Sequence, residues 1–585
     1  MDSRSFSTDF TIIPQSMEKY IGWFVGDLAF LDSYAFLPAS LETLARDLSV
    51  EEKQHFLRQE FANCDLTNLL DKAALPYEYL DSFEKYNEKR LPGIESFYSS
   101  LTDKGITIEM HERLNRVWSQ FNCKTLGDLI DIYLRLDVYL LAAVFENFRE
   151  TSLNDFGIDP PHYMSVPGLS FASAIKMLKV SLRVFTDLEM YMMIENGIRG
   201  GFTTVAKRYA KANNRFLQSY DGGDESWLLY LDVNNLYGKA MCDVLPCSAY
   251  FWVRNRDLNF YLSVEDNAEI GYILEVDLDY PEILHDKHND FPLAPHKMTI
   301  DDSMLSPTAK QILEQLGQKS TKTEKLVATF LPRERNYGKL MEDKRKRVKV
   351  DLVTSEVMAA RRTRKQLCKN MRILSEDKVL FQMLPDSVLL DKPIIVGFTV
   401  LELAKLHVYT LYYDRFKSFY NDNIKLVYSD TDSLLIEIKT NDLPSDMKYF
   451  SDIMDFSDLP VDHYLYSDVN KKKIGCLKDE MSGEVIDEVV ALRPKLYAIK
   501  TENNVKKRAK GVQGVVVKNQ LTFDDYKQSL FNVELVRRMN RRLGSENHII
   551  HLYENEKIAL SPFEDKRYLI DSVNSLAYGH YSIKQ

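Results

Sequence analysis

The chain has 585 residues, of which 45% are hydrophobic, and its formal net charge is −11. This length predicts several domains, and the hydrophobic content is sufficient for packed cores. None of the six cysteines forms a Cys-x-x-Cys pair, which argues against a zinc ribbon or a disulfide framework and favours a reducing compartment. No secretion signal is visible, and no apolar run reaches the roughly 18–20 residues of a membrane span, so we expect an intracellular protein without a membrane anchor.

The first long pattern along the chain is helical. Between Thr125 and Arg149, apolar residues recur three and four positions apart, which predicts an amphipathic helix. Tyr133 and Asp137 lie one turn apart on the same face of this helix. A Tyr-x-x-x-Asp spacing is common on helices by chance, and it gains meaning only from the motifs that follow it.

A glycine pair and an acidic strand end come next. Gly200 and Gly201 let a backbone approach another molecule closely, although an ordinary loop explains the pair equally well. The apolar run from Trp227 to Leu231 stops at Asp232. This pattern predicts a buried strand that delivers one carboxylate at its end.

A helix and a basic region follow. Ser306 as N-cap, Pro307 at the first helical position and Gly317 as the stop predict a short helix. Residues 321–372 contain 16 Lys or Arg against six Asp or Glu. A solvated helix face or a nuclear-import signal explains such a run as well as a grip on nucleic-acid phosphates does. The apolar segment 393–413 predicts a strand and a helix of a core.

The most informative stretch is Tyr-Ser-Asp-Thr-Asp-Ser at 428–433. Apolar runs flank it on both sides, which predicts a strand, a tight turn and a second strand. Asp430 and Asp432 project to the same side of an extended chain, and two clustered carboxylates repel each other unless a cation lies between them. Such a triplet alone is more often a solvated turn. With Asp232 as a second acidic strand end, it predicts a phosphoryl-transfer site with two metal ions, which are expected to be Mg²⁺.

Basic segments continue toward the end of the chain. Residues 471–478 predict a basic strand, and residues 506–511 predict a basic loop. From about residue 512 onward the pattern is helical and then irregular.

These motifs, taken in order, resemble the family B DNA polymerases. Asp232 to Gly238 is similar to motif A of that family, with Asn for the usual Ser and Gly for the usual Pro. Tyr428 to Ser433 resembles motif C, and Lys495-Leu496-Tyr497 resembles the Lys-x-Tyr motif that grips the primer strand. The resemblance is strongest to the protein-primed branch carried by the virus-like transposons called Polintons or Mavericks.

The resemblance implies a mixed α/β, multidomain right-hand polymerase with palm, fingers and thumb, preceded by an incomplete RNase H-like exonuclease domain. The implied divisions are 1–150 for the truncated exonuclease-like domain, 151–225 for the linker into the palm, 226–300 for the first part of the palm, 301–420 for the fingers and insertion region, 421–510 for the second part of the palm, and 511–585 for the thumb.

The resemblance also implies roles for individual residues. The implied catalytic residues are Asp232, Asp430 and Asp432, with Asp430 as the weaker or indirect ligand, and the two metal ions (Mg²⁺, with Mn²⁺ as the alternative) would be held by Asp232, the Val233 carbonyl and Asp432. The implied nucleotide-binding residues are Asn234, Asn235, Leu236, Tyr237, Tyr337 and Gly338, among which Tyr237 blocks a ribose 2′-OH. The implied DNA-binding residues are Gly200, Gly201, Thr431, Lys344, Arg345, Lys495 and Tyr497. The implied partners are a DNA template and primer, deoxynucleoside triphosphates and a terminal protein that serves as primer.

Two motifs of the family are damaged in this chain. Tyr133 and Asp137 resemble the third motif of the 3′–5′ exonuclease, but no Asp-x-Glu precedes them, so we expect a truncated domain without its chemistry. Phe330 stands where motif B of the family has its Lys, and Tyr337-Gly338 begin a good match only after that point. We therefore expect an internal deletion joined near residue 336.

Three other functions remain open. A decayed polymerase that grips DNA without catalysis is favoured by the damaged motif B and disfavoured by the intact acidic triplet. A stand-alone nuclease is disfavoured by the missing carboxylates. An RNA-templated polymerase commonly has an adjacent Asp-Asp pair, whereas this chain has Asp-Thr-Asp. By analogy with integrated elements in eukaryotes, we expect residence in the nucleus.

Overall fold

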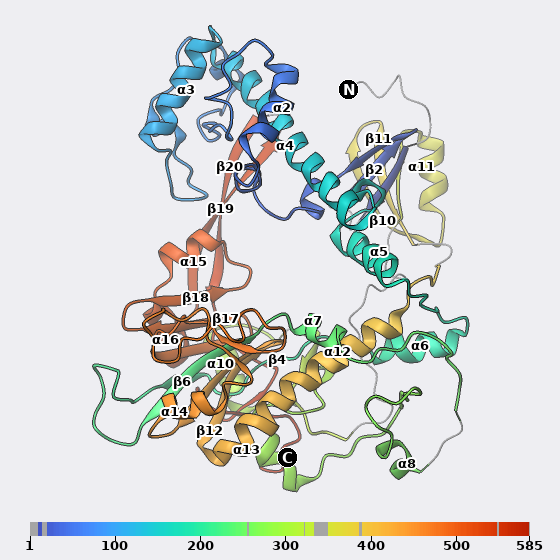
Figure 1. The fold of residues 1–585 in the computed structure, drawn as a ribbon, viewed down its shortest axis with the longest axis vertical. Coiled ribbons are helices and arrows are strands. Elements are labelled where there is room, and N and C mark those ends of the chain that lie inside the picture. The colour runs from blue at the N-terminus through green and yellow to red at the C-terminus, as the bar shows by residue number, and fades with distance from the viewer. Residues whose placement is uncertain are drawn as a thin grey trace. The chain divides into compact units, whose positions relative to one another are not determined.

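The computed structural model describes residues 10–14, 20–253, 257–320, 322–332, 349–384, 389–546 and 549–583. The chain forms two compact units, and each contains both helices and sheets (Figure 1). The first unit comprises residues 1–182, 342–390 and 541–554, and the second comprises 183–341, 391–540 and 555–585. The mixed α/β class is therefore confirmed. Tyr337, Gly338, Lys344, Arg345 and the predicted junction near residue 336 lie outside the described residues.

The first unit combines helices with two small sheets. Its helices are α1 (Leu41–Arg46), α2 (Val50–Glu60), α3 (Ile108–Gln120), α4 (Leu126–Phe156), α5 (Val166–Leu178) and α11 (Glu356–Thr363). One antiparallel sheet consists of β1 (Phe10–Pro14), β2 (Tyr20–Val25) and β3 (Leu28–Leu31) in that order. The other has the order β10 (Cys368–Ser375), β11 (Lys378–Met383), β9 (Lys349–Val353).

The helix predicted at Thr125–Arg149 is confirmed as the start of α4, which is 31 residues long. Thr125 caps it in a capping box with Asp128, and Gly157 ends it in the left-handed conformation at φ 63°. Leu129, Leu136 and other residues of its apolar stripe pack against α1 and α2 in one hydrophobic core. Because the apolar residues of α4 face this core, the orientation of the helix is fixed, and with it the positions of Tyr133 and Asp137.

The second unit is built on a six-stranded sheet. Its order is β14 (Met454–Asp455), β15 (Leu477–Asp479), β6 (Ser226–Val233), β13 (Ser433–Lys439), β12 (Ile424–Asp430), β4 (Thr203–Val205). A neighbouring sheet has the order β18 (Val505–Ala509), β17 (Leu496–Thr501), β16 (Ile486–Arg493), β5 (Tyr209–Lys211). Two short pairs are β7 (His296–Thr299) with β8 (Glu324–Val327), and β21 (Tyr568–Leu569) with β22 (Ser575–Leu576).

Helices cover and connect these sheets. They are α6 (Leu188–Gly197), α7 (Leu236–Met241), α8 (Leu258–Leu262), α9 (His285–His288), α10 (Pro307–Gln315), α12 (Ile394–Tyr409), α13 (Ser418–Tyr420), α14 (Leu443–Tyr449), α15 (Gly514–Gln520) and α16 (Phe523–Phe531). The predicted helix between Ser306 and Gly317 is confirmed as α10, with Ser306 as its N-cap and Gly317 at φ 61°.

The predicted strand that carries Asp232 and the predicted acidic hairpin lie side by side in the middle of the six-stranded sheet. β12 and β13 form the predicted antiparallel hairpin, and β13 also pairs with β6 so that Ser433 lies opposite Asp232. Because these strands are covered on both faces, their sequences are almost continuously apolar. The pairing register therefore delivers the polar ends of β6 and β12 to one edge of the sheet.

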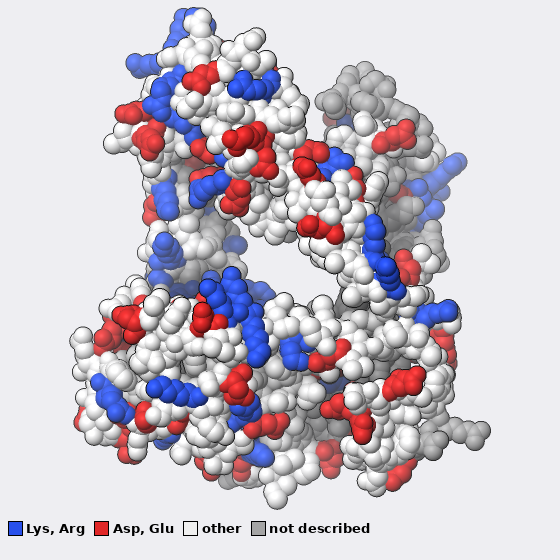
Figure 2. Space-filling model, in the orientation of Figure 1, with Lys and Arg blue, Asp and Glu red and all other residues white. Residues whose placement is uncertain are grey.

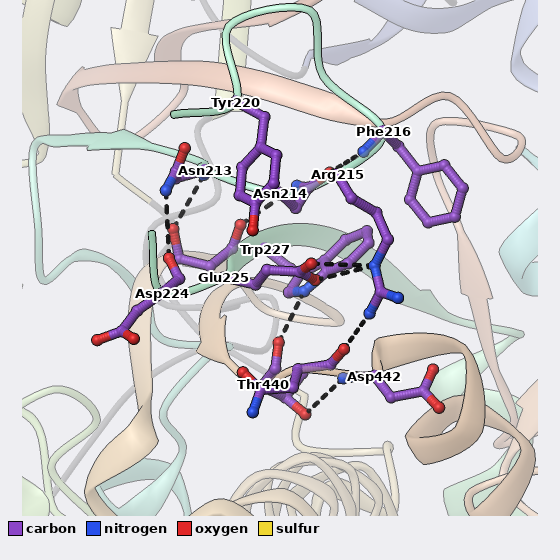
Figure 3. Close-up of polar contacts among 12 residues, drawn as sticks. Asn213, Asn214, Arg215, Phe216, Tyr220, Asp224, Glu225, Trp227, Thr440 and Asp442 are labelled. Carbon is purple, nitrogen blue, oxygen red and sulfur yellow. Dashed lines mark hydrogen bonds and ion pairs between the residues drawn. The ribbon is translucent and has the colours of Figure 1, made fainter. Parts of the chain in front are cut away.

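A polar network anchors the start of β6 at the opposite end from Asp232 (Figure 3). Arg215 lies 3.0 Å from Glu225 Oε1 and also donates to the carbonyl of Asn441. The Trp227 indole N–H donates to the Thr440 carbonyl just after β13, at 3.0 Å. These contacts tie the loop before β6 to the loop after β13, which favours the register that places Asp232 opposite Ser433.

A long apolar helix covers one face of this sheet (Figure 1). The predicted strand in segment 393–413 is wrong, because α12 starts at Ile394 and continues through a π-helical stretch, Thr410–Lys417, to α13. Among the described residues, Ile394–Asn423 is the one helix long and apolar enough to cross a membrane. Here Val400, Phe416 and other residues of this helix lie in the core against the central strands.

The C-terminal part was only half predicted. The helices after residue 512 are confirmed as α15 and α16. The irregular region expected after them is wrong, because β19 (Val536–Glu546) and β20 (Ile549–Leu560) form a two-stranded sheet. The last residues return to the core of the second unit, where the fully buried Arg567 donates to Ser575 Oγ at 2.7 Å and to the Asn289 carbonyl at 2.8 Å.

Candidate active site

Three aspartates meet where β6 and the β12–β13 hairpin end. Asp232 is the penultimate residue of β6, Asp430 is the last residue of β12, and Asp432 lies in the turn. The Val233 N–H donates to the Asp432 carbonyl at 2.9 Å, and the Asp432 N–H donates to the Asp430 carbonyl at 2.8 Å. Backbone contacts therefore hold the two acidic segments together without using any carboxylate.

Asp430 differs from the other two aspartates in its partners. Its Oδ1 accepts a hydrogen bond from the Thr203 hydroxyl at 2.8 Å, and its Oδ2 lies 3.3 Å from the Lys495 ammonium. Both carboxylate oxygens are thus engaged by this chain. This arrangement fits the prediction that Asp430 acts as the weaker or indirect ligand, which stays a prediction.

The electrostatics of the site are those of crowded anions. Burial raises the pKa of Asp232 to about 7, and the neighbouring charges of Asp432 and Glu480 add to this effect. Burial also raises the pKa of Asp432, with a further contribution from Asp430. A pKa raised in this way shows that the ionised pair is destabilised without a compensating cation.

Glu480 belongs to this site although the sequence patterns did not indicate it. It follows β15, which pairs with β6 so that Lys478 lies opposite Asp232. The Lys506 ammonium donates to Glu480 Oε2 at 2.8 Å, and it lowers the pKa of this carboxyl against the opposing effect of burial. Lys478 and Lys506 also act on Asp232, whose pKa they pull down. The ion-paired side chains of Lys478, Glu480 and Lys506 therefore lie close to Asp232.

The donor set fits a hard divalent cation. Asp232 and Asp432 offer carboxylate oxygens beside the Val233 peptide, and such oxygens are the ligands that Mg²⁺ prefers. Among the described residues, no three His, Cys, Asp or Glu side chains converge closely enough to hold a metal ion. Because Asp430 and Glu480 are engaged by lysines, the carboxylate contribution available without rearrangement is that of Asp232 and Asp432.

The turn after Asp232 is fixed by its own side chains. The Asn234 N–H donates to the Cys476 carbonyl at 2.8 Å, and its side-chain amide donates to Asp455 Oδ2 at 2.7 Å. The backbone N–H of Asn234 and one N–H of its side-chain amide are therefore used within the chain, and its nucleotide-binding role stays a prediction. Asn235 has φ 43°, and its side chain accepts from the Gly238 N–H at 3.1 Å, which starts α7.

The nucleotide-binding roles of the other residues of this turn also stay predictions. Leu236 is buried in the core below the turn. Tyr237 is 39% exposed, and burial together with the nearby Asp432 charge raises its pKa. The Tyr237 hydroxyl is therefore close enough to Asp432 to be affected by its charge, and the contact with the sugar of a nucleotide that the resemblance implies for Tyr237 stays a prediction.

The glycine pair has a structural reason that does not involve a ligand. A Cβ added to Gly201 would lie 2.2 Å from Thr431 Cγ2, so the 201 backbone packs directly against the turn between Asp430 and Asp432. Thr431 itself has φ 68°, and its N–H donates to the Phe202 carbonyl at 3.3 Å. Gly200 is buried next to this contact. Binding of DNA by Gly200, Gly201 and Thr431 stays a prediction.

Lys495 and Tyr497, which belong to the predicted Lys-x-Tyr motif, lie next to Asp430. Lys495 forms the β16–β17 turn at φ 63°, and Tyr497 is 5% exposed with its hydroxyl 3.1 Å from that of Tyr230. Both line a cavity of about 530 Å³ together with Asp430. Its other cationic side chains are Lys507, Arg508, Lys510 and Lys518. Figure 2 shows Lys and Arg gathered on this face, over β17 and β18.

The predicted exonuclease-like pair lies in the first unit. Tyr133 and Asp137 do face one point, but the Lys72 ammonium occupies it, donating to Tyr133 Oη at 3.0 Å and forming an ion pair with Asp137. The Tyr77 and Tyr133 hydroxyls are 2.6 Å apart, and burial raises the pKa of Tyr133. The lysine was not indicated by the sequence patterns.

Phe330 occupies the position where the resemblance placed a lysine. It is 3% exposed, and its ring stacks on His285 with 4.3 Å between centroids. The Tyr280 ring also packs against the Phe330 ring, with 4.5 Å between centroids. This residue is therefore part of the core, and it offers no donor to a nucleotide.

Comparison with known proteins agrees with the site. A family model described as DNA polymerase type B, organellar and viral, matches residues 11–302, which include Asp232. A protein of Ascobolus immersus described as a probable DNA polymerase is 24% identical over 220 residues, which are 37% of this chain and 15% of that protein. The chain thus spans less than a fifth of the length of that relative.

Two solved structures of phi29 DNA polymerase show weak overall similarity. The complex with primer-template DNA and incoming nucleotide gives a TM-score of 0.38, and the complex with single-stranded DNA gives 0.40. In both cases the identity is 13%, and the similarity covers 96% of this chain and 86% of the other. From the family match, the chain belongs to the type B DNA polymerases, in their organellar and viral group.

Proposed function

We propose that this protein is a DNA-directed DNA polymerase that adds deoxynucleotides to a primer 3′-OH and releases pyrophosphate. The observation that carries the proposal is that Asp232, near the end of β6, lies beside the turn that holds Asp432, whose backbone carbonyl accepts from the Val233 N–H at 2.9 Å. Burial and the charge of Asp432 raise the pKa of Asp232 there. An arrangement of this kind is stable in the ionised form when cations bind. Family membership makes nucleotidyl transfer the reaction to which such a site belongs.

Each residue of the site has a separate role in the proposed reaction. Asp232 and Asp432, with the Val233 carbonyl, would hold Mg²⁺, which supplies charge neutralisation and activation of the primer hydroxyl. Asp430, held by Thr203 and Lys495, keeps the turn in place and couples it to the primer side. Tyr237 lies against the site where the sugar of the incoming nucleotide would sit. Lys495 and the basic cavity below it would bind the phosphates of the primer strand.

The biological setting is part of the same proposal. The motifs that resemble the protein-primed branch support replication of a virus-like mobile element, with a terminal protein as primer, inside the cell and in the nucleus. The partners would be primed template DNA and deoxynucleoside triphosphates.

One observation favours a second function, which is DNA binding without catalysis. Phe330 is a core residue where the resemblance places a triphosphate-binding lysine, and losing one such donor typically costs about 10²–10³ in rate. Primer extension on a primed template, with Mg²⁺ and all four deoxynucleotides, separates the two functions. Extension establishes the polymerase. Tight binding of the primed template with no extension under these conditions would instead establish the second function.

A further inference from the structure

A lysine-rich turn is joined directly to the strand end that carries Asp232. Residues 470–476, here called the lysine loop, contain the exposed Lys471, Lys472 and Lys473. The Gly475 N–H donates to the Asn234 carbonyl at 2.8 Å, while the Asn234 N–H donates back to Cys476. The loop is therefore bound to the residue two positions beyond Asp232, through both the backbone N–H and the backbone carbonyl of Asn234.

A buried carboxylate fixes the tip of this loop. Asp455 is 4% exposed, and its Oδ2 accepts both the Asn234 side-chain amide at 2.7 Å and the Lys472 N–H at 2.8 Å. Lys472 is held at φ 55°, a left-handed conformation that costs free energy for any residue with a side chain. Asn470 supports the tip from below by donating to the Ser451 and Met454 carbonyls.

The base of the loop is fixed as well. Gly475 has φ 83°, and a Cβ there would lie 3.0 Å from Lys239 of α7. The His407 ring lies 2.8 Å from the Gly475 carbonyl, which connects the loop to α12. Such a constrained turn holds the backbone that carries these lysines at a fixed position relative to Asp232, as a binding site requires.

The lysines of the loop have no carboxylate partner among the residues that the structure describes. Within the described part of the chain, no carboxylate forms an ion pair with Lys471 or Lys472, whereas the Lys473 ammonium donates to Asn470 at 3.3 Å. Exposed lysines of this kind are usually just solvated. This loop differs from an ordinary basic surface, because its backbone is strained at Lys472 and is held by the buried Asp455. Such strain persists only where the surrounding structure enforces it.

The position in the sheet indicates which anion the loop would meet. β15, which follows the loop, pairs with one edge of β6, and β13 and then β12 lie beyond the other edge. The basic cavity with Lys495 lies on the β12 side, next to Asp430. The lysine loop lies on the opposite side of Asp232. A reaction that joins a primer to a nucleotide and expels pyrophosphate needs one cationic region for each product.

We propose that the lysine loop is a polyphosphate site, in which Lys471 and Lys472 contact the phosphates that become pyrophosphate. The proposal rests on the polymerase function proposed above. In the reaction, the 3′ oxygen of the primer bonds to the α-phosphorus while the bond from the α-phosphorus to the bridging oxygen breaks. That oxygen leaves with the electron pair on the β-phosphate, and the proton of the 3′-OH passes to solvent water. Two ammonium groups beside the leaving group would neutralise the charge that develops on it.

The test measures binding and needs no turnover. Inorganic tripolyphosphate is titrated into the full chain in the presence of Mg²⁺, for wild type, for K471Q/K472Q and for the control K425Q/K448Q. The control removes the same charge from two exposed lysines, of which Lys425 lies at the end of β12 remote from Asp430. We expect the loop variant to bind tripolyphosphate about tenfold more weakly and the control to bind it like wild type.

The same three proteins are titrated with primed template DNA, and we expect equal affinities. Equal tripolyphosphate affinity of all three proteins, or no tripolyphosphate binding by wild type, overturns the proposal. A loop variant that loses DNA affinity instead also overturns it, since the loop would then be a DNA contact. The single variants K471Q and K472Q, each with an expected partial loss, replace the double variant if its thermal unfolding shows that it does not fold. Failure of wild type to extend a primer despite normal tripolyphosphate binding would contradict the polymerase function but not the loop.

Discussion

Gly201 and Thr431 are in contact across the second unit, and this contact places the backbone before β4 directly against the acidic turn. A Cβ on residue 201 would lie 2.2 Å from Thr431 Cγ2 and 2.4 Å from its Oγ1. The glycine is thus required by packing against the turn between Asp430 and Asp432. It links Gly201 to the turn between Asp430 and Asp432, which lies more than 200 residues later in the chain, in one structural element.

Gly201→Ala should therefore destabilise the second unit by about 1–3 kcal/mol, as overpacking does. Thr431→Gly in the same chain should restore most of the loss, because it removes the clash and also the strain at φ 68°. Hydrogen exchange of the β12 and β13 amides measures the effect. Gly271→Ala is the matched control, since a Cβ there meets nothing within 4 Å. If the β12 and β13 amides exchange at the same rate in Gly201→Ala as in Gly271→Ala, the packing of residue 201 against Thr431 is not tight.

Asn235 should tolerate glycine better than alanine. Its side chain caps the Gly238 N–H, and its φ of 43° is a conformation that alanine resists. We expect Asn235→Ala to cost about 1–2 kcal/mol and Asn235→Gly only a few tenths, measured by thermal unfolding. Equal destabilisation by the two substitutions would mean that the left-handed backbone is not important at this position.

Lys72 is predicted to hold the buried face of α4 together. Lys72→Met leaves Asp137 without its ion-pair partner, and we expect a loss of about 1–3 kcal/mol, reduced from the fully buried case because both side chains are partly exposed. The double variant K72M/D137L should be more stable than the single one, because it leaves no unpaired charge. Hydrogen exchange in α4 reports both effects. A double variant no more stable than Lys72→Met would argue against the ion pair.

Glu488 should make the second unit sensitive to acid. It is 5% exposed, and although burial opposes ionisation, the Lys527 ammonium and the Tyr209 hydroxyl lower its pKa. A carboxyl whose folded pKa is lowered contributes stability that is present above its unfolded pKa of about 4.3 and is lost as the pH falls through the folded value. Glu488→Gln should remove that part of the pH dependence.

The check is the urea midpoint of wild type and Glu488→Gln at pH 7 and below pH 4. The difference between the two proteins should be larger at pH 7 and should shrink in acid. A difference that stays constant with pH would show that Glu488 gains nothing from Lys527 in the folded state.

The central strands could be predicted because their signals are local. The apolar runs before Asp232 and around Asp430 are continuous, and the turn residues between β12 and β13 interrupt them where the hairpin bends. The caps of α4 and α10 were equally readable, since Thr125 and Ser306 accept the hydrogen bonds that their residue types predict.

Two of the misses, Glu480 and Lys72, share a physical cause, which is that they reach the site through contacts with residues distant in the sequence. Glu480 joins the site because β15 pairs with β6, about 250 residues earlier in the chain, and no local pattern announces that register. Lys72 is likewise brought to Asp137 by packing. The third miss has another cause. Apolar residues of segment 393–413 show no periodicity that distinguishes a strand from a helix. The β-branched Ile394 and Ile395 favoured a strand at its start, where the structure has a helix.

The central claim is that Asp232 and Asp432 carry the chemistry and that Asp430 acts through Thr203 and Lys495. Single-nucleotide primer extension by wild type, Asp232→Asn, Asp432→Asn and Asp430→Asn tests it most directly, with exposed Asp462→Asn as the control. We predict that the 232 and 432 variants lose at least about 10³ in rate, that the 430 variant loses about tenfold, and that the control matches wild type. Extension at the wild-type rate by Asp432→Asn, or a larger loss in Asp430→Asn than in Asp432→Asn, would contradict the account.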